Sequence, residues 1–87
     1  MRRVLKYTLP IDSQVHRFPM GQVVMAESGN GRLILWILVQ VDPATLAADG
    51  SMDLVVIPTG SNVPESGLPV ASVRDRSFVW HVFEVLS

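Results

Sequence analysis

The sequence contains no cysteine, and only 17% of its residues are charged, whereas an average globular domain has about 25% charged residues. Without cysteine the chain forms no disulfide, which is the usual means by which a small secreted domain stabilises a small core. Zinc sites built on thiolates are excluded for the same reason. The absence of cysteine fits a protein of the cytoplasm or of a virion.

Neither sign of charge is in excess, because the net charge is -1 and the pI is about 6.0. Proteins that bind nucleic acid usually gather a basic surplus on one face, but here the seven basic residues are scattered along the chain. They are Arg2, Arg3, Lys6, Arg17, Arg32, Arg74 and Arg76. We therefore expect no nucleic-acid partner.

Long hydrophobic runs are also missing. The longest, Leu33–Val39, has seven apolar residues, against the roughly 20 that a membrane-spanning helix needs. Near the start of the chain, Lys6 and Pro10 interrupt the apolar stretch that a signal peptide requires. The sequence thus predicts neither a membrane partner nor secretion through a signal peptide.

The same apolar run is the most informative feature that is present. A half-buried strand alternates apolar and polar residues, whereas the segment Arg32–Val41 has no polar break between Leu33 and Val39. This pattern predicts a strand that is buried on both faces. With 48% hydrophobic residues in 87 positions, the composition indicates one folded domain, residues 1–87.

Short apolar segments separated by proline, glycine and asparagine predict an all-β domain. The Asn30-Gly31 step lies between two of these segments and predicts a tight antiparallel hairpin. Six to seven strands at this spacing indicate a small antiparallel sandwich or barrel. The expected strands are Arg2–Leu9, Val15–Phe18, Gln22–Glu27, Arg32–Val41, Met52–Thr59, Val70–Arg74 and Phe78–Leu86.

Two segments between the expected strands have the composition of connections. Asp42, Pro43 and Gly50 suit the start and the end of a very short helix. The sequence therefore allows one short helix over residues 43–49, with a plain loop as the alternative. A loop is also expected over residues 60–69, which contain two glycines and two prolines.

Residues suited to catalysis or metal binding are few. The histidines are His16 and His81, and His81 stands between apolar residues, where we expect packing or a hydrogen bond within the last strand. No acid–histidine–nucleophile set can be read from the sequence, and two histidines without cysteine match no usual zinc spacing. We predict no catalytic residues, no metal site and no cofactor.

One short polar segment could contact a ligand. The end of an expected strand carries Thr59, Gly60, Ser61 and Asn62, and the backbone amides of such small residues can cradle an anion. The chain then continues into Pro64 instead of a helix, so the segment is not a phosphate-binding loop of the usual kind. A structural turn is expected here, with an anion or nucleotide contact beside a second subunit as the alternative.

Aromatic residues are also few, and no basic groove accompanies them, so base stacking is not expected. We predict that they anchor the core or an interface, above all Trp36, Trp80 and Phe83. Several expected strands are apolar on both faces, which is more than one sandwich interior can bury. The sequence therefore predicts a homo-oligomer, with a dimer favoured. The alternative is a monomer whose loops at 42–51 and 60–69 cover the outer faces.

The last expected strand contains the motif Val79-Trp80-His81-Val82-Phe83-Glu84. Together with Lys6-Tyr7, Leu35-Trp36 and Thr59-Gly60-Ser61-Asn62-Val63-Pro64, it resembles a family of small proteins of unknown function encoded by phages and actinobacterial prophages. The resemblance spans nearly the whole chain, although Pro58 and Met20-Gly21-Gln22 depart from the family pattern. It implies a phage origin and no enzyme activity, and it assigns no active residues.

These observations lead to the hypothesis of a phage accessory protein that acts by binding other proteins and is not an enzyme. Such a protein is either a modulator of a host protein, acting in the host cytoplasm, or an accessory component of the virion. The alternative is a small-ligand or nucleotide-binding sponge formed by an oligomer, to which Arg74 and Arg76 would contribute positive charge.

Overall fold

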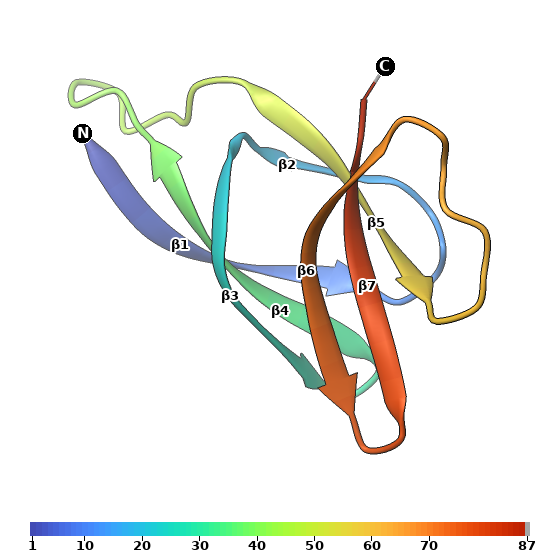
Figure 1. Ribbon diagram of the computed structural model, residues 1–87. Coiled ribbons are helices and arrows are strands. Elements are labelled where there is room, and N and C mark those ends of the chain that lie inside the picture. The colour runs from blue at the N-terminus through green and yellow to red at the C-terminus, as the bar shows by residue number, and fades with distance from the viewer. Residues whose placement is uncertain (87) are drawn as a thin grey trace.

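Two antiparallel sheets pack face to face in the computed structural model, which describes residues 1–86 (Figure 1). The three-stranded sheet has the order β1-β4-β3 and consists of β1 (Arg2–Pro10), β4 (Arg32–Gln40) and β3 (Gly21–Gly29). The four-stranded sheet has the order β2-β5-β7-β6 and consists of β2 (His16–Pro19), β5 (Ser51–Pro58), β7 (Phe78–Val85) and β6 (Gly67–Asp75). The predicted all-β fold is confirmed, in the form of a seven-stranded sandwich.

Two tight turns join neighbouring strands. Asn30 and Gly31 have positive φ angles of 53° and 78°, as the type I′ turn of a two-residue hairpin requires, so the hairpin predicted from this step is confirmed. β6 and β7 are joined by a second two-residue turn, since Asp75 pairs with Phe78. Between them Arg76 has a φ of 57°. Both hairpins therefore close within a few residues of the chain.

β4 contributes alternate side chains to the core. The four that are at most 1% exposed are Leu33, Leu35, Ile37 and Val39. They belong to one cluster with buried residues of the opposite sheet, among them Leu54, Val56 and Val82. The side chains between them are only half-buried on the outer face, namely Ile34, Trp36 and Leu38. Within the single chain a second layer covers one face only, so the expected burial of Arg32–Val41 on both faces is met on the inner face alone.

β5 is the strand that is buried on both faces. On the face that points away from the core, Val55 and Ile57 are only 2% and 8% exposed. Phe83 of β7 stands opposite Val55, and the loop after β5 turns back against this face, so that Ile57 and Phe83 line one pocket together with Val63. The loop expected over residues 60–69 is shorter, because β6 begins at Gly67, and its residues 60–66 cover part of this outer face.

Residues 43–49 form a loop, so the short helix that the sequence allowed is absent. Asp42 caps a first turn as expected, because its Oδ1 accepts a hydrogen bond from the Ala44 amide at 2.7 Å. Leu46 then takes a positive φ of 59°, which ends any right-handed helix. The Asp42 amide donates to the Ala47 carbonyl at 2.9 Å, and the chain returns toward the end of β4.

Candidate functional site

Four strands lie at sheet edges, and three of them are short, irregular or flanked by another strand. β2 has only four residues and ends at Pro19. β6 contains Pro69 and an irregularity between Pro69 and Ala71. β3 is irregular between Val23 and Met25 and lies alongside β6 (Figure 1). Each of these features protects an edge from pairing with another chain.

β1 is the exception among the four edges. It is the outer strand of the three-stranded sheet. Its nine residues pair with β4 in one unbroken register, from Arg2 opposite Gln40 to Pro10 opposite Arg32. Proline occurs only at its last position. β1 therefore offers a long, regular edge of the kind to which a further strand can add.

The first pair of the ladder shows where the main-chain groups of β1 point. The Val41 amide donates to the Met1 carbonyl at 2.7 Å, and the Met1 amino group donates to the Val41 carbonyl at 3.4 Å. Hydrogen-bonded pairs alternate along antiparallel strands, so every second residue after Met1 turns its main-chain groups toward β4. The residues that turn theirs away are Arg2, Val4, Lys6, Thr8 and Pro10. Within residues 1–86 no main-chain hydrogen bond from another segment reaches this outward series.

The outer face of the three-stranded sheet carries apolar side chains beside this edge. Trp36 is half-buried there, between Lys6 of β1 and Met25 of β3. The Lys6 ammonium lies 5.8 Å from the centre of the indole ring, within the range of a cation–π contact. Met25 is 50% exposed, and Val4, opposite Leu38, is 52% exposed. We call the group of Val4, Met25, Trp36 and Leu38 the apolar strip.

β1 is also basic, and it contains no acidic residue. Its charged side chains are Arg2, Arg3 and Lys6. The ion pairs within residues 1–86 lie elsewhere, with 3.1 Å between Arg17 Nε and Asp53 Oδ1 and 2.9 Å between His16 Nε2 and Asp12 Oδ2. Asp53 raises the pKa of Arg17, and the hydrogen bond with His16 lowers the pKa of Asp12. The three cations of β1 have no acidic partner in the described part of the chain.

A second candidate site lies on the outer face of the four-stranded sheet, where the loop after β5 meets β7. It is a pocket of about 250 Å³ lined by Ile57, Pro58, Thr59, Gly60, Ser61, Val63, His81 and Phe83. Three of the four residues of the predicted anion-binding segment are in this lining. The fourth, Asn62, is exposed and does not line the pocket.

Hydroxyl groups hold the His81 ring of this pocket from both sides. Thr59 Oγ1 lies 2.8 Å from Nε2, and Ser72 Oγ lies 2.8 Å from Nδ1. Because the Thr59 hydroxyl donates to the Val79 carbonyl at 3.1 Å, its oxygen accepts from His81 Nε2–H, and in the neutral ring Nδ1 then accepts from the Ser72 hydroxyl. The ring thus links β7 to β6 and to the end of β5. These contacts could not be predicted from the sequence, since the partners are 22 and 9 residues away.

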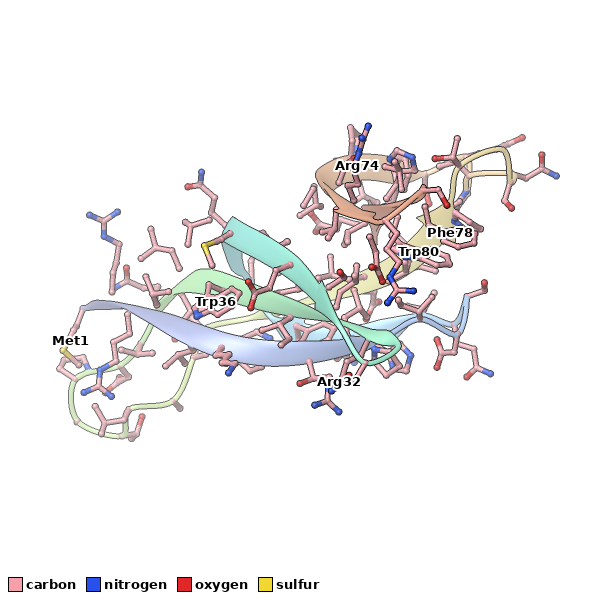
Figure 2. The ribbon with its side chains drawn as sticks, turned by 90° about the horizontal axis from the view of Figure 1, so that it is seen from below. Met1, Arg32, Trp36, Arg74, Phe78 and Trp80 are labelled. Carbon is pink, nitrogen blue, oxygen red and sulfur yellow. The ribbon has the colours of Figure 1, made fainter. Side chains whose placement is uncertain are left out.

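The three aromatic residues predicted as anchors lie on three different surfaces. Trp36 belongs to the three-stranded sheet, well apart from Trp80 (Figure 2). Trp80 is half-buried against the core, and it stacks on the 63% exposed ring of Phe78 with 6.0 Å between ring centres. Phe83 lines the pocket beside His81. Of these three aromatic residues, only Trp36 lies beside the open edge of β1.

Two kinds of feature are missing from the described residues. Within residues 1–86 no three His, Asp or Glu side chains are grouped so as to hold a metal ion. The same part of the chain contains no helix that is both long and apolar enough to cross a membrane.

Comparison with known proteins adds a family. A family model described as Domain of unknown function (DUF7352) matches residues 1–87. Neither the curated proteins nor the solved structures contain a match to the chain.

Proposed function

We propose that this chain, which belongs to the family described as Domain of unknown function (DUF7352), is a non-catalytic module that binds another protein by accepting a strand at the edge of β1. The observation that carries the proposal is the contrast between the four edges. The edge strands β2, β3 and β6 are short, irregular or flanked by another strand, while β1 presents nine residues in one regular register. An edge left open in this way is suited to adding a partner strand.

The chemistry of strand addition explains how such an edge would work. The outward N–H and C=O groups of Val4, Lys6 and Thr8 would bond to the main chain of the partner, which supplies affinity without reading its sequence. The apolar strip lies on the outer face beside this ladder, and Trp36 is the kind of large aromatic anchor that dominates binding energies. Main-chain bonds and an aromatic anchor together would give a short segment both affinity and register.

The biological setting that we propose is that of a phage accessory protein. The support is the C-terminal motif and its companions along the chain, which resemble proteins encoded by phages and prophages. The partner would be a host protein, met in the host cytoplasm, or a component of the virion. Purified virions separate the two forms, because an accessory component is abundant in them and a modulator of a host protein is not.

Exchange of one residue of the edge tests strand addition. Thr8→Pro removes an outward N–H that β4 does not use, as Pro10 already does two residues further on, so the fold should survive. We expect Thr8→Pro to lose the partner that the unchanged protein captures from infected cells or virions, and the matched Thr8→Val variant to retain it. Equal capture by both variants would exclude β1 as the binding edge.

We also propose that the chain forms a homodimer, through the outer face of the three-stranded sheet on the side of β3, which leaves the β1 side open to the partner strand. The support is the exposure of Met25, which is 50% exposed beside the half-buried Trp36. Because this contact would be apolar, salt should not dissociate it, unlike a contact built on surface ion pairs. We expect sedimentation at micromolar concentration to give twice the chain mass of 9.6 kDa at low and high salt alike. A monomer under both conditions would contradict the dimer.

The alternative function is a small-ligand or nucleotide-binding sponge formed by an oligomer. The observation in its favour is the pocket that brings Thr59, Gly60 and Ser61 against His81. Arg74 lies on β6 two residues beyond Ser72, the partner of His81. A thermal shift against a panel of nucleotides tests this function, since a ligand at 100 times its dissociation constant adds about 2.7 kcal/mol to the stability. No shift with any nucleotide would remove the sponge from consideration.

A further inference from the structure

We infer that the segment accepted by β1 is an extended acidic peptide of a different protein, in which an apolar residue stands between acidic ones. This inference rests on the proposed function and adds the chemistry of the partner to it. It follows from the charge of the edge, from the positions of the apolar strip, and from the place where the ladder must end.

Charge is the first argument. β1 carries three cations and no acidic residue, and its cations have no acidic partner within residues 1–86. An added strand runs about 4.8 Å from β1, so its side chains stand directly opposite those of the edge. Opposite charges in such cross-strand pairs are attractive, and like charges are repulsive. A segment rich in aspartate or glutamate is therefore favoured over a neutral or basic one.

The same argument disfavours a second copy of β1 as the occupant. Two β1 edges paired about a twofold axis would bring six cations, three from each strand, along one seam. A register centred on Lys6 would place the two Lys6 side chains directly opposite each other, and a neighbouring register would leave them on the diagonal. The described chain provides no acidic residue in β1 to offset this repulsion. The partner segment must therefore supply the negative charge.

The apolar strip places one apolar residue within the acidic segment. On the outer face, the side chain of the added strand that stands beside Val4 contacts apolar surface, so an apolar residue fits there. Acidic residues fit beside Lys6 on the same face and beside Arg3 on the other face. The ladder ends at Pro10, which has no N–H to donate. Outward groups from Arg2 to Thr8 thus accommodate a segment of about seven residues, given one ladder step for each residue.

A displayed library of random twelve-residue peptides, selected on the full-length protein, tests the inference. We expect the selected peptides to be enriched in acidic residues on both sides of an apolar one. When a selected peptide is titrated into labelled protein, the amide signals of Val4, Lys6 and Thr8 should shift more than those of Leu5 and Tyr7, because only the first three amides point outward.

Charge reversal provides the matched variants. The double variant Arg3→Glu with Lys6→Glu should weaken binding of the selected peptide about tenfold, since each exposed charge pair changes an equilibrium constant by roughly one-and-a-half- to fivefold. Arg76→Glu, in the turn between β6 and β7, should leave affinity within about twofold. The neutral double variant, Arg3→Gln with Lys6→Gln, should have an affinity between those of the reversed double variant and Arg76→Glu. It also controls for a folding defect in the reversed double variant.

The outcomes separate the inference from the proposed function. Selected peptides that shift the outward amides of β1 but carry no acidic excess, or that bind the reversed variant equally well, would overturn the acidic partner and leave strand addition standing. Peptides that shift only residues around His81, or a library that yields no binder, would overturn both. Self-pairing of β1 edges in solution, seen as a dimer abolished by Thr8→Pro, would also overturn the acidic partner.

Discussion

Truncation of Leu35 to alanine is expected to lower the free energy of unfolding by about 2–5 kcal/mol. Leu35 is 0% exposed and lies in the middle of β4, the central strand of the three-stranded sheet. Both neighbouring strands fix the backbone here, so the cavity cannot close by a local shift. Since a small domain has a total stability of roughly 5–15 kcal/mol, the midpoint of urea denaturation should move by a large fraction of its value.

The matched control for Leu35→Ala is Val15→Ala, just before β2 and outside the proposed binding edge. Val15 is 52% exposed, and a surface truncation of this kind changes stability by about 0.5 kcal/mol or less. Equal denaturation midpoints for the two variants would mean that Leu35 does not face the core, and the assignment of inward and outward positions in β4 would have to be reversed.

Gly21→Ala is expected to destabilise the protein by roughly 1–3 kcal/mol or more, as overpacking does. Gly21 begins β3 and stands opposite Val39. A Cβ atom at this position would overlap the carbonyl oxygen of Leu38 and would lie 2.8 Å from Ile37 Cγ2. The carbonyl belongs to the main chain of the central strand, so relief of the overlap requires that β3 and β4 move apart. Thermal or urea denaturation of the purified variant measures the effect.

Gly29, at the other end of β3, provides the control. A Cβ atom there meets only Ile34 Cδ1, at 3.9 Å, which is ordinary contact. Gly29→Ala should therefore be neutral or stabilise the fold by about 0.4–1 kcal/mol, because alanine restricts the unfolded chain. If both variants were equally stable, the close approach of Gly21 to β4 would be refuted.

The sequence was sufficient for the strands and for the sharpest turn, because both depend on neighbours along the chain. Asn30-Gly31 suits a turn with two positive φ angles whatever surrounds it. The sequence does not show which face of β4 the single chain buries, for a physical reason. The outer side chains of β4 are apolar as well as its inner ones, so the two-residue period that distinguishes the faces is hidden in the run from Leu33 to Val39.

The candidate sites depend on which strands lie side by side, and a single sequence does not contain that information. The sequence predicts the polar segment of Thr59 and the strand of His81 separately. Their contact exists only because β5 and β7 are neighbours in the sheet. The open edge is a property of strand order in the same way. In the sequence Arg2, Arg3 and Lys6 are three of seven scattered basic residues. They form a basic edge only because β1 is the outer strand of its sheet.

The strand order also has a consequence for the sequence of events in folding. The β3–β4 and β6–β7 hairpins close through two-residue turns, and such hairpins form in about 1–10 μs. β1 must instead reach β4 across the residues between Pro10 and Arg32, the shortest closure in their ladder, and this longer closure costs more entropy than a two-residue turn. We therefore expect β1 to join an existing β3–β4 hairpin, so that the edge forms only when the sheet is completed. A newly made or partly folded chain would then present no such edge, and the proposed partner would bind only the folded protein.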